Sequence, residues 1–290
     1  MLNLKAKVIP FFDSFTSTYS YLVYAEGHPE CAVIDSVLDY EPRSARISTT
    51  SAQQIVDAIK KRGLSLEWIL ETHAHADHLS ASAWLKEQLG GKTAIGGPIT
   101  KVQATFKEIY NLGDEVSTDG RPFDRLLYDG DQLHIGPLLV DVLYVPGHTA
   151  ADMAYHVHGA GVFVGDTLFQ PDVGTARCDF PSGSAQQLYQ SIQKLYDFAD
   201  DTVLYMCHDY PPKGRAPSPT STIGAQKAHN IHVRTGISQD EFVRMRQARD
   251  KNLPMPRLLL PSLQINIRAG ELPRAEENQT RYLKTPLNRF

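Results

Sequence analysis

The sequence predicts an α/β fold, because short apolar runs typical of strands alternate along the chain with longer runs of helical periodicity. The strand-like runs that open the chain are Val8–Phe12, Tyr19–Tyr24 and Cys31–Asp35. The first helix is expected to begin at Thr50 or Ser51 and to end at about Arg62, where Gly63 would stop it. Later helices are expected over His78–Leu89, Ile99–Leu112, Ala185–Phe198, Thr222–Val233 and Asp240–Asn252.

Length and composition fit one large domain with or without an extension, since 42% of the 290 residues are hydrophobic. The net charge of −4 with mixed signs does not indicate nucleic-acid binding. Met1–Lys7 has no sustained apolar run behind it and no segment is long enough to span a membrane, so neither a signal peptide nor an anchor is expected. Three scattered cysteines favour a reducing compartment, and we expect the cytoplasm. Leu258–Leu260 could form a contact in a homo-oligomer or a buried strand.

The most informative segment is Thr72–His78, which reads T-H-A-H-A-D-H directly after an apolar run. Neutral imidazole and carboxylate groups bind divalent cations of the zinc class, whereas an exposed turn gains nothing from bunching them. A strand would put His73 and His75 on one face, and a following helical turn would carry Asp77 and His78 toward the same point. Taken alone, the segment could also be an exposed, histidine-rich turn.

Three later strand-like runs each end in a histidine or an aspartate. P-G-H-T brings His148 after the first run, G-D-T brings Asp166 after the second, and C-H-D-Y brings His208 after the third. Side chains at strand ends on a rigid scaffold can be held in fixed geometry around a cation that stays open to substrate. We therefore expect these three side chains to join those of Thr72–His78.

The order of the motifs, T-H-x-H-x-D-H, P-G-H-T, G-D-T and a late histidine, resembles the metallo-β-lactamase superfamily over residues 8–210. The resemblance implies a four-layer αβ/βα sandwich, with two mixed sheets face to face, helices outside and metal at one sheet edge. After Tyr210 the composition shifts to a linker-like, proline-rich loop, so we expect a catalytic domain over residues 1–210 and a helical C-terminal extension, 211–290, packed on the same domain. The fold alone does not decide the reaction, because this scaffold carries hydrolases and redox enzymes alike.

The resemblance also implies a ligand set. In the two-metal arrangement, His73, His75 and His148 would form the first site and Asp77, His78 and His208 the second, with Asp166 bridging them. In the persulfide dioxygenase branch of the superfamily, one Fe(II) per chain would be held by His73, His148 and Asp166. The residues His75, Asp77, His78 and His208 would then support the centre or stay unfilled.

Local sequence favours the dioxygenase branch, and within it a bacterial β-lactamase-like hydrolase subgroup linked to sulfide detoxification. Gly165–Phe169 and the loop Gly174–Phe180, which reads G-T-A-R-C-D-F, are similar to that branch, and Leu260–Gly270 resembles its closing P-x-N-x-R-x-G. The resemblance implies that glutathione persulfide and O₂ are converted to sulfite and glutathione. Two histidines and one aspartate leave three positions on iron open, enough for O₂ and a substrate sulfur together.

Three residues are expected to contact the substrate. Arg177 could pair with a carboxylate or sulfinate, because a planar guanidinium binds these groups bidentately. Tyr210 could hydrogen-bond the substrate sulfur or a bound oxygen, and Arg268 of the closing motif is the third candidate. The alternative for Arg177 is an ion pair with Asp179 or Asp172 that fixes its own loop.

Other chemically active side chains have simpler expected roles. Cys178 and Cys207 are expected to be small packing residues. His156 and His158 are expected on the surface, because no carboxylate lies between them in the sequence. Asp35 could orient a ligand histidine or cap the turn that follows it.

Two rival functions remain open at this point. A dinuclear zinc thioesterase of the glyoxalase II type, which hydrolyses S-acylglutathione, would use the same ligands with zinc, one or two ions, in place of iron. A non-catalytic, thiol-responsive binding protein is the other, and the complete set of ligand residues argues against it.

Overall fold

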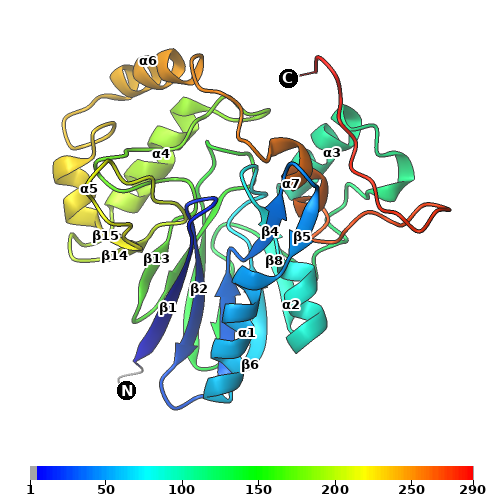
Figure 1. Cartoon of the computed structure of the whole chain (residues 1–290). Helices are drawn as coiled ribbons and strands as arrows, with labels where there is room; N and C mark the ends of the chain where they lie inside the picture. Colours follow the sequence, from blue (N-terminus) through cyan, green and yellow to red (C-terminus); the bar gives the residue numbers. More distant parts are fainter. Residues whose placement is uncertain (1–4, 290) are drawn as a thin grey trace.

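Two six-stranded sheets lie face to face, with helices on both outer sides and a third, small sheet at one end (Figure 1). The computed structural model describes residues 5–289, so the first four residues of Met1–Lys7 lie outside it. The four layers and the mixed sheets confirm the predicted αβ/βα sandwich.

The first sheet joins two antiparallel pairs to a parallel half, in which β3, β6, β8 and β9 run side by side. Its strands, in spatial order, are β1 (Ala6–Asp13), β2 (Thr18–Ala25), β3 (Glu30–Ile34), β6 (Ser65–Leu70), β8 (Lys92–Gly96) and β9 (Arg125–Leu127).

The second sheet is antiparallel except for the parallel pair β13 and β14. In spatial order its strands are β10 (Gln132–Ile135), β11 (Leu138–Tyr144), β12 (Met153–Val157), β13 (Gly161–Phe163), β14 (Val203–Tyr205) and β15 (Thr220–Thr222). The last strand lies beyond residue 210, so the segment after that residue supplies one edge of the sheet. The small sheet contains β4 (Val37–Glu41), β5 (Arg46–Ser48) and β7 (Leu79–Ser80).

The helices cover the outer faces in two groups. On the first sheet lie α1 (Thr50–Arg62) and α2 (Ser82–Leu89), and on the second lie α4 (Ala185–Tyr196) and α5 (Ile223–His229). The helix α6 (Gln239–Asp250) packs on α4. The helices α3 (Ile99–Ile109) and α7 (Leu259–Asn266) pack together at the end of the sandwich, beside a short 3₁₀ turn at Gly113–Glu115. Gly63 ends α1 in the left-handed conformation, as the sequence predicts.

The main core fills the space between the two sheets and follows the two-residue period of the strands. In β11 the side chains of Leu138, Val140 and Val142 point inward and are buried, whereas Asp141 between them points outward. Each such buried aliphatic side chain stabilises the fold by roughly 1.5–3 kcal/mol relative to an exposed one. The core therefore fixes the ends of the strands, and with them the loops that follow.

Two expectations about local structure were wrong. The helix expected from His78 begins only at Ser82, because residues 79–80 pair with β4 as strand β7 and only Ala81 separates them from the helix. Leu258–Leu260 is neither an exposed contact nor a strand: Leu258 and Leu259 are buried at the start of α7. Within the described residues, no helix is long and apolar enough to cross a membrane.

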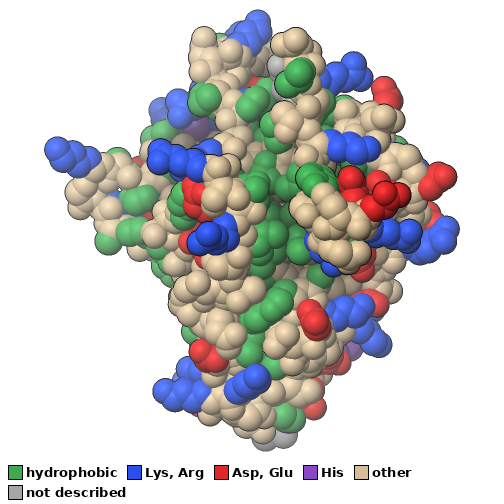
Figure 2. All heavy atoms as spheres, turned by 45° about the vertical axis from the view of Figure 1, so that its right-hand side comes forward, with side chains coloured by type: hydrophobic (Ala, Val, Ile, Leu, Met, Phe, Trp, Pro, Cys, Tyr) green, Lys and Arg blue, Asp and Glu red, His purple; other side chains and the backbone are tan. Residues whose placement is uncertain are grey.

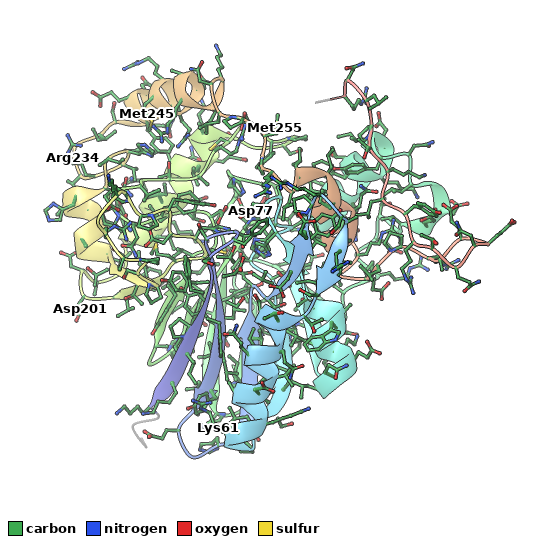
Figure 3. The ribbon with its side chains drawn as sticks, viewed as in Figure 1. Lys61, Asp77, Asp201, Arg234, Met245 and Met255 are labelled. Carbon is green, nitrogen blue, oxygen red and sulfur yellow. The ribbon has the colours of Figure 1, made fainter. Side chains whose placement is uncertain are left out.

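The face that carries α7 and the C-terminal segment shows Lys and Arg side chains interspersed with Asp and Glu (Figure 2). Hydrophobic side chains gather in a hollow at its centre. Asp77 lies at the end of the sandwich opposite Lys61, where the loops of both sheets meet (Figure 3).

Candidate metal centre

The histidine segment is a loop that hangs from the end of β6, rather than the strand and helical turn that the sequence suggested. Asp35, just after β3, holds this loop: its Oδ1 accepts a hydrogen bond from the Thr72 N–H (2.7 Å) and lies 3.0 Å from Nε2 of His75. Asp35 has φ 52°, an uncommon conformation for a residue with a side chain. Its carboxylate thus orients a candidate ligand histidine, one of the two roles considered for it.

The first group of candidate ligands joins the two sheets. It consists of His73 from the β6 loop, His148 from the loop after β11, and Asp166 from the loop after β13. Nε2 of His148 lies 3.5 Å, and Nε2 of His73 3.9 Å, from Oδ2 of Asp166. All three side chains are buried.

In both histidines of this group, Nδ1 is hydrogen-bonded to a neighbouring residue, and Nε2 faces Asp166. Nδ1 of His148 donates to the Arg177 carbonyl (2.8 Å), and a carbonyl oxygen can only accept. Thr72 Oγ1 donates to Asp35 (3.0 Å) and therefore accepts from Nδ1 of His73 (3.0 Å). Both rings consequently present an unprotonated Nε2 to the centre, the form that binds a metal.

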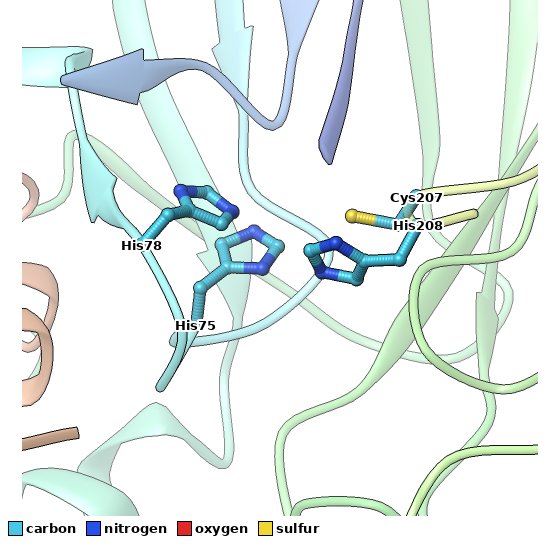
Figure 4. Close-up of side chains that lie close together, drawn as sticks. All are labelled: His75, His78, Cys207 and His208. Carbon is cyan, nitrogen blue, oxygen red and sulfur yellow. The ribbon is translucent and has the colours of Figure 1, made fainter. Parts of the chain in front are cut away.

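A second group lies beside the first and is drawn in Figure 4. It contains His75, His78, Cys207 and His208, whose ligand atoms all lie within 4.8 Å of one another. Asp77 approaches it, with Oδ2 at 3.2 Å from Nε2 of His208. Cys207 is buried as expected, but the structure also places its sulfur against these rings, a role that the sequence did not indicate.

Several buried polar atoms in these two groups have no hydrogen-bond partner within the described chain. They are Nε2 of His73, His78 and His208, Nδ1 of His75, Oδ2 of Asp77 and Oδ1 of Asp166. Unsatisfied buried groups of this kind are rare in native proteins, and here nitrogen lone pairs face carboxylate oxygens. Such a set of donors fits one or two divalent cations.

The charge states support the same reading. Burial lowers the pKa of His148 to about 4 and that of His208 to about 3, so both rings are neutral near pH 7. Burial, together with the Asp77 carboxylate, raises the pKa of Asp166 well above its usual value. Ionising the buried Asp166 carboxyl beside the Asp77 carboxylate is therefore unfavourable, and a bound cation removes that penalty.

Glycines allow the ligand loops to approach their neighbours closely. Gly147, before His148, has φ 145°, and a Cβ there would collide with the backbone of Leu188 in α4. Gly165, before Asp166, has φ 53°, and a Cβ would lie 2.8 Å from Oγ1 of Thr72. Both positions therefore require glycine to bring the ligands together.

A cleft of about 450 Å³ opens onto the first group. Asp77, His148 and Asp166 lie at its base, and Tyr210 lines its wall, stacked on His208 with a ring separation of 5.7 Å. Its walls are largely apolar, formed among others by Phe169, Val173, Phe180, Ile231, Leu253 and Pro256. The volume falls within the usual range for small-molecule sites.

Arg177 lines the cleft, but its donors are already engaged. Nε and Nη2 donate to Asp179 (2.6 and 2.7 Å), and Nη1 donates to the Pro254 carbonyl (2.6 Å). This is the loop-fixing pair considered above as the alternative role. Arg268 lies elsewhere: its Nε donates to the Gln264 carbonyl, Nη1 is 3.6 Å from Glu115, and it is absent from the cleft lining.

The C-terminal segment holds the histidine loop through Asn266, at the end of α7. Its Nδ2 donates to the carbonyls of His75 (2.7 Å) and His78 (2.8 Å), and its Oδ1 accepts from the Ser80 N–H (2.8 Å). Asn266 is part of the closing motif, but nothing in the sequence indicates these contacts.

Helix α6 holds the loop Gly174–Phe180, which contains no candidate ligand itself but contacts His148. Arg246 is fully buried, pairs with Asp250 one turn later, and donates from Nη1 to the Thr175 carbonyl (2.9 Å). Asp250 accepts from the Cys178 N–H (2.9 Å). Between these two anchors lies the Arg177 carbonyl that orients His148, so α6 acts on a ligand through the backbone.

Comparisons with known proteins agree with this geometry. The chain is 51% identical to a probable metallo-hydrolase of Burkholderia pseudomallei, over 96% of this chain and 98% of the relative. It is 47% identical to glyoxylase B2 of Dictyostelium discoideum, over 99% of each. A human mitochondrial protein named persulfide dioxygenase ETHE1 is 27% identical over 89% of this chain and 87% of the relative.

Among solved structures, the crystal structure of ETHE1 from Myxococcus xanthus matches with a TM-score of 0.73 and 30% identity, over 91% of this chain and all of that chain. The family model described as the metallo-beta-lactamase superfamily matches residues 13–208, which include every candidate ligand. This match explains the order of the motifs, the paired sheets and the position of the candidate ligand loops. The chain belongs to the metallo-beta-lactamase superfamily.

Proposed function

We propose that the protein is a persulfide dioxygenase that uses one Fe(II) per chain to oxidise glutathione persulfide with O₂ to sulfite and glutathione. The observation that carries the proposal is the separate grouping of His73, His148 and Asp166. Two histidines and one carboxylate on one side of an ion, with the other side open, are typical of non-haem Fe(II) oxygenases.

His75 supports this assignment. Its Nε2 faces Asp35 at 3.0 Å and Glu71 at 3.4 Å, so that nitrogen is directed at carboxylates. The His75 ring lies between those of His73 and His78, 4.0 and 4.1 Å away, but its ligand atom groups with those of His78 and His208. A hydrolytic two-zinc centre of the family would need His75 as the third histidine of the first site. Here the first group contains only two histidines and one aspartate.

Within this proposal, each residue has a defined task. His73, His148 and Asp166 hold the ion, which when bound supplies the one-electron chemistry between O₂ and sulfur that no side chain provides. The apolar walls of the cleft exclude water around the reacting groups. Tyr210 offers a phenol to the substrate sulfur, and Arg177, paired with Asp179, lines the same cleft. We place the reaction in the cytoplasm, since all three cysteines are free thiols.

The second candidate is a dinuclear zinc thioesterase that hydrolyses S-acylglutathione. The observation that favours it is the complete second group, in which Asp77 and His208 accompany His75 and His78. A second ion there could share Asp166, whose Oδ1 is 3.4 Å from Nε2 of His208. The 47% identity to a relative named glyoxylase B2 supports the same alternative.

The decisive experiment measures metal content and two activities on one preparation. The protein is produced with iron and zinc both available, and iron and zinc per chain are counted. Oxygen uptake and sulfite are then followed with glutathione persulfide, and hydrolysis with S-lactoylglutathione. About one iron per chain with oxygen uptake supports the proposal, whereas two zincs per chain with hydrolysis alone would replace it by the thioesterase.

Two variants sharpen this experiment. His148→Ala removes a ligand of the first group, and His208→Ala removes one of the second. A single-iron centre predicts that the first variant loses its iron and the second keeps most of it. A two-metal hydrolase predicts that both variants lose metal and activity together.

A further inference from the structure

A row of polar side chains crosses the outer face of the second sheet, far from the centre described above. Gln132 of β10 is directly opposite Asp141 of β11, and Asp141 is directly opposite His156 of β12. His158 follows His156 by two residues, so the two rings lie on the same side of the sheet. The sequence alone shows no partner for these histidines, because the carboxylate comes from the neighbouring strand.

The four side chains are in contact. Oδ2 of Asp141 lies 2.6 Å from Nε2 of His158 and 3.6 Å from Nδ1 of His156, and the two rings are 4.6 Å apart. Gln132 donates to the other carboxylate oxygen of Asp141 (2.8 Å), which leaves Oδ2 to the histidines. One ligand atom from each of the two histidines and Asp141 can be chosen so that all three lie within 4.8 Å of one another.

These spacings suit a transition-metal ion. Zinc binds histidine nitrogen and carboxylate oxygen at about 2.0–2.2 Å, so ligand atoms on one ion lie up to about 4.4 Å apart. Only small movements of the partly buried Asp141 and His156 and of the exposed His158 would bring the three to those distances. The ring of Phe198 packs edge-on against His156 at 4.9 Å, which limits the rotation of that ring.

The charge state of the cluster agrees with such a site. Burial and the neighbouring His158 lower the pKa of His156, so its ring is neutral near pH 7. The hydrogen bond from His158 lowers the pKa of Asp141, so its carboxylate is ionised. Two imidazoles and one carboxylate suit zinc, nickel or copper and offer little to magnesium or calcium.

We propose that Asp141, His156 and His158 form a second, peripheral binding site for a divalent ion of the zinc class. This site is separate from the catalytic centre. The strand β12 reaches the centre only at its first residue, Met153, whose backbone N–H donates to the Thr72 carbonyl beside the histidine loop. His156 and His158 lie three and five residues further along, roughly 10 and 16 Å away. An ion held here links β11 to β12, and through Gln132 it also steadies the edge strand β10.

The test is a zinc titration of the full chain with its catalytic centre already loaded. Zinc chloride is added to the wild-type protein and to the double variant His156→Gln/His158→Gln, and binding is followed by calorimetry while retained catalytic metal is counted. The wild type should bind one more zinc ion per chain than the double variant. This difference does not depend on which metal or reaction the catalytic centre has.

Further variants grade the result. Asp141→Asn keeps the size of the side chain but removes its charge, and it should abolish the additional zinc. Gln132→Ala removes only the hydrogen bond to the ligand carboxylate and should weaken zinc binding roughly 10- to 100-fold. His28→Gln, an exposed histidine outside the cluster, is the matched control and should bind zinc as the wild type does. Equal zinc stoichiometry in the wild type and the double variant would overturn the proposal, since the cluster would then be an ordinary hydrogen-bonded group.

Discussion

Replacing Asn266 by alanine removes three buried hydrogen bonds at once, all of them to the backbone of the histidine loop or of β7. The bonds join its side chain to His75, His78 and Ser80 at 2.7–2.8 Å, and only 3% of Asn266 is exposed. A buried hydrogen bond contributes about 1 kcal/mol net, so the variant should lose about 3 kcal/mol of unfolding free energy. For a chain of 290 residues, that corresponds to a fall of roughly 5 °C in Tm.

The loop that Asn266 holds carries His73, His75 and His78, so its metal affinity should fall as well. Loss of an outer hydrogen-bond partner in a metal site costs roughly 10- to 100-fold in affinity, and we expect a change in that range for Asn266→Ala. Asn266→Asp keeps the acceptor for Ser80 but turns an oxygen toward two carbonyls. It should therefore be at least as damaging as alanine, although its shape is unchanged.

Calorimetry of the metal-free protein measures the stability change, and metal retained against a chelator measures the affinity. Asn252→Ala is the control, since that exposed side chain makes a single bond to the Ala248 carbonyl and should change stability by no more than about 0.5 kcal/mol. If Asn266→Ala melted like the wild type and kept its metal equally well, the positioning role of α7 would be wrong.

Three other predictions concern the loop Gly174–Phe180, whose Arg177 carbonyl contacts His148. Arg246→Ala leaves Asp250 buried without its charged partner, so urea unfolding should show a loss of about 3–5 kcal/mol, whereas the exposed Arg249→Ala should be nearly neutral. Arg177→Ala should raise the KM for glutathione persulfide with iron content unchanged, and an unchanged KM would reject substrate contact. Lost iron would instead show that the pair with Asp179 fixes the loop whose carbonyl orients His148. Burial lowers the pKa of His232 to about 4 from an unfolded value near 6.5, so its contribution to stability is present above pH 6.5 and is lost as pH falls toward 4. Urea midpoints of the metal-free protein at pH 7 and pH 5 should therefore lie closer together in His232→Gln than in the wild type, and equal gaps would contradict this assignment.

The sequence was informative wherever strand periodicity ended in a polar group. The runs before His148, Asp166 and His208 are strands β11, β13 and β14, and their end loops meet as expected. The ends of these strands could be predicted because the alternation of apolar and polar residues, and the glycines at the turns, reflect local requirements of the backbone. The helix expected from His78 was wrong, because residues 79–80 form a two-residue strand with β4 and so short a strand leaves no pattern in the sequence.

Contacts between strands were beyond the sequence. His156 and His158 had no visible carboxylate partner, because Asp141 becomes their neighbour only through the register of β11 and β12. Cys207 was assigned to the core by its apolar strand, yet its sulfur meets the rings of the second group. Pairings of this kind depend on register, which the chain specifies only through its packed core.

The residues that position the ligands were hardest to foresee, because they act on backbone atoms that every sequence contains. Asn266 binds carbonyls of the histidine loop, and Arg246 with Asp250 fixes the loop whose carbonyl orients His148. The ligands therefore come from the two sheets, while their supports come from α6 and α7. A metal site whose ligands are displaced by about 1 Å binds and reacts poorly. The candidate metal centre therefore depends on the segment after residue 210, which positions its histidines.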